Sequence, residues 1–241
     1  MDALASLAHM PARPAGQIFA AWMRGAWRLF RLAPLAILAL SLLPILVEAA
    51  LQLLPGIGIV LSKLLTPPAS AWVLVMIDSR ARAGAFAPRR ATRRWWTRLP
   101  QIALAAVLLG AVFAFQMLTA ALIGGSDQAM AFALGDIERL TLSRAEVAAV
   151  LASGVIPGSL VIFVVPRVVL DGNGVGPAII ESLSLVVRYW RPVAMYAALS
   201  AALIASLLWV PLLLLVFLPL AGCAGYAMYR DVFDPTPVAC A

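Results

Sequence analysis

The sequence predicts an all-α integral membrane protein with about six transmembrane helices, two or three amphipathic interfacial helices and both termini in the cytoplasm. Three observations predict this class. The 241 residues are 63% hydrophobic and only 12% charged, well below the proportion of charged residues that is usual in soluble domains. Several apolar runs exceed about 18 residues, the length that indicates a membrane-spanning helix. Basic residues are concentrated in a few connecting segments and are nearly absent from the others.

The densest basic segment runs from Asp78 to Arg98 and sets the predicted topology. It holds seven arginines: Arg80, Arg82, Arg89, Arg90, Arg93, Arg94 and Arg98. Because such a segment crosses a bilayer only at high cost, we expect it to stay in the cytoplasm and to fix the orientation of the flanking helices. Of the 18 basic residues, 15 then fall in cytoplasmic segments, Arg139 and Arg144 fall in an outer loop, and Lys63 falls within a span.

The chain divides into a loose N-terminus (1–14), a single membrane domain (15–233) and a loose C-terminal tail (234–241). Residues 15–31 carry apolar and arginine side chains on opposite faces, which suits either a helix in the headgroup layer or one packed on the protein itself. A second amphipathic helix is expected at 177–191. The predicted spans are 33–54, 57–77, 100–123, 146–170, 192–209 and 211–229.

Caps, turns and prolines indicate where these spans begin, end or bend. Ser143 and Glu146 have the spacing of a capping box, which predicts the start of the fourth span. The Asp-Gly-Asn-Gly sequence at 171–174 is a predicted turn. Pro67 and Pro68 fall inside the second span, and we expect them to kink or break it, because proline lacks the amide hydrogen that a helix needs.

A repeat relates the segments that precede the spans. Shifting the chain by 160 residues superposes Arg28 on Arg188, with neighbouring polar and apolar positions also matched. A shift of 66 residues places Arg28 on Arg94. Each matched segment precedes a pair of spans. The sequence therefore predicts three units, each a surface helix followed by a membrane hairpin, arranged as parallel repeats.

Two oppositely charged residues, Glu48 and Lys63, lie inside the first hairpin. The hairpin reverses near residue 55, so both side chains lie about 11 Å below the turn at about 1.5 Å per residue. Charged residues within spans are costly, tend to pair, and face protein or water. The pair is either a structural ion pair or part of an ion or proton pathway. Gln116, in the third span, either joins that site or bonds a neighbouring helix.

Catalytic signatures are absent from the sequence, so no enzymatic activity is expected. The sole histidine, His9, lies in the N-terminal segment, and there is no metal-binding His-Glu-x-x-His run, phosphate loop or nucleophile elbow. Cys223 and Cys240 suggest neither a disulfide nor a metal site, and no cofactor is expected. Nucleic-acid binding would require a soluble module and more aromatic residues for base stacking than Trp95 and Trp96.

Four stretches together resemble a family of uncharacterised bacterial inner-membrane proteins with six spans. They are GQIFAAWMRGAWRLFRLAP, LLPGIGIVLSKLLTPP, PRVVLDGNGVGPAIIESLSLVVRYWRP and AGYAMYRDVF. The likeness covers residues 15–233. More distantly, the chain resembles the membrane domains attached to some glycerophosphodiester phosphodiesterases. The resemblance implies a six-span, repeated architecture in a bacterial inner membrane, and it carries over no activity and no functional residue.

Two functions remain open at this point, and a third, a membrane enzyme, would require a polar cluster assembled from residues that are distant in the sequence. The first is a non-enzymatic polytopic protein that organises lipids or a partner complex, with the seven arginines contacting anionic lipid. The alternative is a small-solute or proton-coupled transporter or channel that uses Glu48 and Lys63. The expected partners are the lipid bilayer, its anionic headgroups, and a membrane-protein partner or a second copy of the chain. Nucleic acid is not an expected partner.

Overall fold

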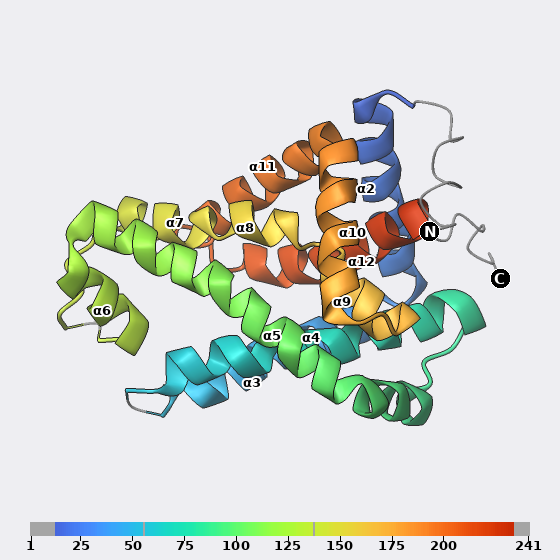
Figure 1. Ribbon diagram of the computed structural model, residues 1–241, viewed down its shortest axis with the longest axis horizontal. Helices are drawn as coiled ribbons and strands as arrows, with labels where there is room; N and C mark the ends of the chain where they lie inside the picture. Colours follow the sequence, from blue (N-terminus) through green and yellow to red (C-terminus); the bar gives the residue numbers. More distant parts are fainter. Residues whose placement is uncertain (1–12, 55, 137, 234–241) are drawn as a thin grey trace.

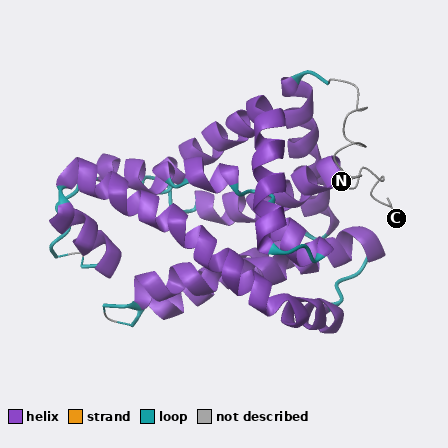
Figure 2. Cartoon of the chain, in the orientation of Figure 1, coloured by secondary structure: helices purple, strands orange, loops and turns teal. Residues whose placement is uncertain are grey.

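The computed structural model describes residues 13–54, 56–136 and 138–233. All regular secondary structure in these ranges is helical, as Figure 2 shows. In chain order the elements are α2 (Ala15–Leu32), α3 (Pro34–Gln52), α4 (Gly58–Ala83), α5 (Pro88–Gly124), α6 (Ser126–Leu134), α7 (Arg144–Ser153), α8 (Val155–Leu160), α9 (Val164–Pro166), the π-helix η2 (Arg167–Asp171), α10 (Val175–Arg188), α11 (Trp190–Ser206) and α12 (Leu213–Phe233).

Several of these helices match a membrane protein in length and composition. Within the described ranges, α3, α4, α5 and α12 are long and apolar enough to cross a membrane. A fifth candidate is the bent pair of α7–α8 and α9–η2, whose two parts meet at 50°. Helix α11, with 17 residues, lies at the lower limit of the length that can span a bilayer. The all-helical class is therefore confirmed, with four or five candidate spans.

The long helices form three hairpins, which reverse at the same end of the molecule (Figure 1). They are α3 with α4, α5 with α7–α8, and α11 with α12. Helices α2 and α10 run across the opposite end, roughly perpendicular to α8 and α12 in this view. We call this opposite end the basic end. It includes the end of α4, the start of α5, η2 and the end of α12. These segments carry Arg80, Arg82, Arg89, Arg90, Arg93, Arg94, Arg98, Arg167 and Arg230.

Contacts between the hairpins follow a cyclic order. Helices α2 and α3 pack against α12, and α5 packs against α4. Helix α10 packs against α8, α9 and η2, and α11 packs against α7 and α8. Each surface helix and first span thus contact the second span of the preceding hairpin, and the first hairpin closes onto the last. Three equivalent units would produce this order of contacts.

Helix α2 buries its apolar face against the protein itself. Ile18, Trp22, Ala26 and Leu29 are buried at spacings that place them on one side of the helix, where it contacts α12. The Trp22 indole nitrogen donates a hydrogen bond of 3.0 Å to Asp231 near the end of α12. Of the two interpretations left open by the sequence, the structure therefore supports packing on the protein for this face.

Two element boundaries differ from the expected ones. Helix α5 begins at Pro88, so Pro100 does not start the third span but lies inside one continuous helix. The loop before it covers only residues 84–87, and most of the arginine segment is consequently helical. Helix α4 continues through Pro67 and Pro68 without the break that these residues suggested.

The local signals around the fourth span are present. Ser143 and Glu146 form the predicted capping box at the start of α7. The predicted turn at 171–174 follows η2, and Gly172 adopts a positive φ of 79° there. This backbone conformation is readily accessible to glycine and strained for most other residues.

The fourth span is broken between α8 and α9, and α10 fills the break. Pro166 accounts for the break, because its ring clashes with the carbonyl four residues earlier and it lacks an amide hydrogen. The hydroxyl of the fully buried Ser182, on α10, donates to the Leu160 carbonyl at 2.8 Å and accepts from the Phe163 amide at 3.3 Å. A side chain of α10 therefore replaces backbone bonds that the bent span has lost.

Candidate functional site

Asp78, near the end of α4, lies at the centre of the basic end and is only 3% exposed. Its carboxylate accepts hydrogen bonds from Arg82 Nε at 2.6 Å, Arg94 Nη1 at 3.2 Å and the Tyr226 hydroxyl at 2.9 Å. A buried carboxylate needs such partners, because an unpaired charge is very costly in an apolar interior. These four residues, the Asp78 cluster, join α4, α5 and α12.

Arg94 and Arg98 extend this cluster to the fourth span. Arg94 also donates a hydrogen bond to the carbonyl of Leu170 in η2. Arg98, one turn further along α5, lies against Gly172, where an added Cβ would overlap its guanidinium group. A larger residue at position 172 would have to displace the Arg98 side chain. Two arginines on one face of α5 therefore hold the end of η2 and the turn after it.

A second ionic cluster surrounds Arg167 of η2. Its Nε donates to Glu181 of α10 at 2.6 Å, and its Nη1 donates to Asp171 at 2.5 Å. Asp171 also accepts a hydrogen bond of 2.6 Å from the Tyr229 hydroxyl. The guanidinium carbon lies 4.3 Å from the centre of the Phe233 ring, within the range of a cation–π contact. Helix α12 thus supplies one tyrosine to each cluster.

Arg80 completes the set of arginines that bind the protein. Its Nη2 donates to the carbonyl of Leu32, the last residue of α2, at 2.9 Å, and its guanidinium lies over the Phe86 ring. Cations near the end of a helix interact favourably with its unpaired carbonyls. Four of the seven arginines proposed from the sequence as lipid contacts therefore contact the protein: Arg80, Arg82, Arg94 and Arg98.

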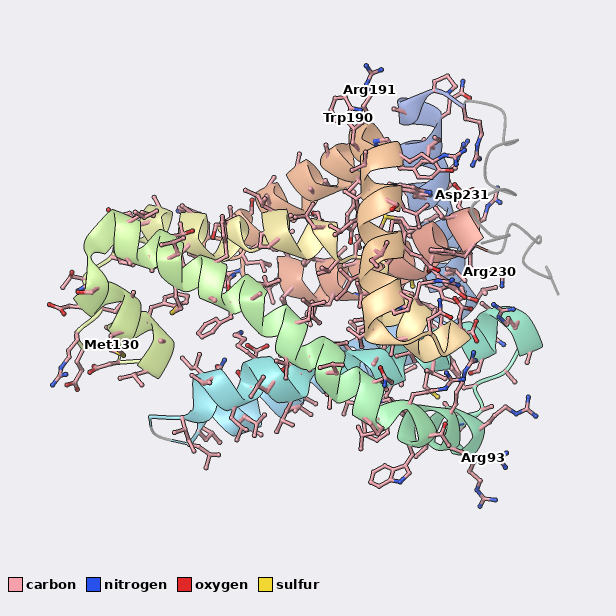
Figure 3. All side chains as sticks on the ribbon, in the orientation of Figure 1. Arg93, Met130, Trp190, Arg191, Arg230 and Asp231 are labelled. Atoms are coloured by element: carbon pink, nitrogen blue, oxygen red, sulfur yellow. The ribbon has the colours of Figure 1, made fainter. Side chains whose placement is uncertain are left out.

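The other three arginines, Arg89, Arg90 and Arg93, are exposed at the start of α5. Within the described part of the chain, no hydrogen bond or ion pair engages them. Figure 3 shows Arg93 reaching away from the body of the protein. Because α5 has 3.6 residues per turn, the side chains of Arg89 and Arg93 leave the helix in a different direction from those of Arg94 and Arg98. Arg90, four residues before Arg94, lies one turn earlier on the same face as Arg94.

Two of these exposed arginines line a shallow, open groove on the outer surface of α5. We call it the arginine groove; it is lined by Pro88, Arg89, Thr92, Arg93, Trp96 and Thr97. Trp96 is 65% exposed although it is a large apolar side chain. The groove therefore combines two cations and an exposed indole, which suits a ligand with both an anionic and an apolar part.

The intramembrane candidates Glu48 and Lys63 lie against each other, with Lys63 Nζ in contact with Glu48 Oε1. Gln52 donates a further hydrogen bond of 3.2 Å to the same carboxylate. The two charged side chains are 25% and 34% exposed. Gln116 lies elsewhere, since its amide donates to the Leu151 carbonyl of α7 at 3.0 Å. It therefore links α5 to α7 and makes no hydrogen bond to the Glu48–Lys63 pair.

Metal ligands do not gather anywhere in the described ranges. No group of three or more His, Cys, Asp or Glu side chains there could hold a metal ion. Cys223 is buried within α12.

Sequence reasoning missed the residues that hold the basic end together, above all Asp78, Asp171 and the two tyrosines of α12. A signal was nevertheless present. The second helix of every hairpin carries an aspartate at or close to its end: Asp78, Asp171 and Asp231. Each of these helix ends contacts the surface helix of the next unit. Asp78 pairs with Arg94 of α5, and Arg167, four residues before Asp171, pairs with Glu181 of α10. Asp231, in the last unit, accepts a hydrogen bond from Trp22 of α2 in the first unit.

No family model, curated protein or solved structure matches this chain. The two charged regions that bear on function are the Asp78 cluster and the arginine groove. The first is internal and its carboxylate is fully paired. The second is exposed, and its cations have no protein partner in the described ranges.

Arg94 binds the buried Asp78 whereas Arg93 is exposed, so substitutions at these two adjacent residues should differ in their effect on stability. Arg94→Gln should lower the free energy of unfolding by about 1–3 kcal/mol, because it leaves the buried Asp78 carboxylate with one partner fewer. Arg93→Gln, which removes the same charge one position earlier, should be close to neutral. Unfolding of the purified full chain in detergent measures both. Equal destabilisation by the two substitutions would contradict the division.

Proposed function

We propose that this chain is a non-enzymatic, six-span protein of a bacterial inner membrane that organises anionic lipids around its basic end. In this proposal both termini lie in the cytoplasm, so the basic end faces the cytoplasmic leaflet. Helix α11 and the bent pair would join α3, α4, α5 and α12 to make six spans. The bacterial inner membrane rests on the family resemblance and on the distribution of basic residues along the chain.

The observation that carries the proposal is the exposed position of Arg89 and Arg93 beside Trp96 in the arginine groove. Basic residues near an anionic membrane surface each contribute about 1 kcal/mol to binding. Tryptophan is enriched at the membrane–water interface, where its ring meets apolar chains and its nitrogen meets water. A phospholipid headgroup with its adjoining acyl chains would satisfy both kinds of side chain in the arginine groove.

Two hydrogen bonds hold the start of α5 against α4. The Trp72 indole donates to Thr92 at 3.0 Å, and the Trp95 indole donates to the Pro68 carbonyl at 2.8 Å. The first turns of α5 therefore lie beside the middle of α4, with the chains antiparallel.

Substitution of two groove arginines tests the proposal. Arg89→Gln with Arg93→Gln should reduce the retention of anionic phospholipid roughly ten- to thirtyfold, because two basic residues at about 1 kcal/mol each are lost. Native mass spectrometry of the full chain, extracted gently from its membrane, measures the lipid retained. The substitutions spare Arg94, which pairs with the buried Asp78, and Arg98, which lies against Gly172.

A matched control removes the same charge from the other end of the molecule. Arg139→Gln with Arg144→Gln should leave retention unchanged, because these residues lie in the loop before α7 and in its first turn. Orientation in the membrane is checked by protease protection for every variant. Unchanged retention of anionic phospholipid in a correctly oriented groove variant would contradict the lipid proposal. A stoichiometric protein lost only from that variant would assign the groove to a membrane-protein partner or a second copy.

The contact between Glu48 and Lys63 favours a second candidate function, a small-solute or proton-coupled transporter or channel. Both side chains are partly exposed although they lie within candidate spans, and charged residues there commonly mark ion pathways. Glu48→Gln should then leave the protein folded and abolish solute or proton flux in reconstituted vesicles. Absence of flux with the unaltered chain across a broad panel of solutes would remove this candidate.

A further inference from the structure

Helix α10 presents a second apolar face that no other part of the described chain covers. Ile180, Leu183, Val187 and Trp190, at the start of the next helix, follow one another at spacings of three or four residues and so share one side. Ile180 is 68% exposed and Val187 is 74% exposed. We call these four residues the α10 stripe. A water-facing helix would carry polar side chains at these positions.

The opposite face of α10 is fixed in place, so the helix cannot turn to bury the stripe. Ser182 is bonded to both sides of the break in the fourth span. Glu181 is paired with Arg167. Ala178 and Leu185 are buried against the protein on the same side as Ser182. The stripe therefore faces outward because the internal bonds of α10 require it.

Helix α2 provides an internal comparison, since the repeat aligns it with α10. Its apolar residues are covered by α12, and its exposed positions include Gln17, Arg24, Arg28 and Arg31. The two surface helices thus lie across the same end of the molecule (Figure 1), but the exposed side of α2 is mainly polar and that of α10 mainly apolar. Helix α2 also exposes Trp27 and Leu32, but these two lie among its arginines, whereas the exposed apolar residues of α10 form a continuous stripe.

The surroundings of the stripe identify this partner as lipid. Helix α10 contacts α8 and α11, whose own exposed residues include Ile156, Leu160, Met195 and Leu199. The stripe is therefore adjacent to the apolar outer surfaces of α8 and α11, two of the helices that the proposal places in the membrane. At its end, the Arg191 guanidinium lies 5.2 Å from the centre of the Trp190 ring (Figure 3). Tryptophan and arginine together are typical of a helix end at the headgroup layer.

We propose that α10 is an in-plane membrane anchor, with the α10 stripe among the acyl chains just beneath the headgroups at the basic end. This contact goes beyond the proposed function, because it uses a different surface and needs no anionic lipid. It places lipid on one side of α10 and the break in the fourth span on the other. Ser182 then links the lipid-contacting helix directly to the bent span.

Single fluorescent labels test where the stripe lies. The full chain carries Cys223→Ala and Cys240→Ala, and an environment-sensitive fluorophore is attached at Val187→Cys or, as the matched control, at Arg24→Cys on α2. The protein is reconstituted in neutral phosphatidylcholine vesicles that contain nitroxide lipids, labelled either near the headgroup or near the chain end. Each variant must elute as the unaltered protein does before it is compared.

The label at position 187 should emit as in an apolar environment and be quenched several-fold more than the label at position 24. The shallow nitroxide should quench it more than the deep one. Emission typical of water without quenching would overturn the proposal. Apolar emission without quenching by lipid would also overturn it, because another protein surface would then cover the stripe. Repeating the test at Ile180→Cys makes the result independent of one substitution.

Because the vesicles are neutral, the outcome is separate from that of the arginine-groove experiment. Quenching at position 187 with unchanged lipid retention in the groove variant would support the anchor and reject the anionic-lipid site. The reverse combination would support the anionic-lipid site alone.

Discussion

A carboxylate that is buried at the end of an apolar helix must be neutralised by its neighbours, and Asp78 receives hydrogen bonds from three side chains on three helices. Breaking such a buried pair is costly, because the remaining charge stays in a poorly polar environment. The positions of α4, α5 and α12 at the basic end are therefore linked to one another. Arg94 carries the link further, to the carbonyl of Leu170 and thus to the fourth span.

This requirement divides the basic residues between two tasks. Arginines whose side chains leave α5 toward the interior bind carboxylates, carbonyls or a glycine turn, whereas those on the outer side lack any such partner in the described ranges. Arginines on either side of α5 contribute equally to the positive charge that would orient the chain in a membrane. Stability and surface binding can nevertheless be altered separately, because adjacent residues such as Arg93 and Arg94 perform different tasks.

Much of the fold could be predicted from the sequence, because helix class, capping box and glycine turn depend on local patterns of residues. The long-range details could not. Pro100 resembles a helix start, yet α5 passes through it, and the coverage of α2 by α12 depends on contacts about two hundred residues apart. The seven arginines formed one block in the sequence, and only helical geometry separates Arg89 and Arg93 from Arg94 and Arg98. Asp78 was visible only as one acid beside many arginines.

A double-mutant cycle between Asp78 and Arg94 tests the central claim most directly. The free energy of unfolding in detergent is measured for the full chain, for Asp78→Asn, for Arg94→Gln and for the double variant. If the buried carboxylate holds α5 against α4 through this arginine, the two effects will be coupled by about 0.5–3 kcal/mol, and the double variant will lose less than their sum. Effects that add within about 0.5 kcal/mol would show that the two residues act independently, and would contradict the account.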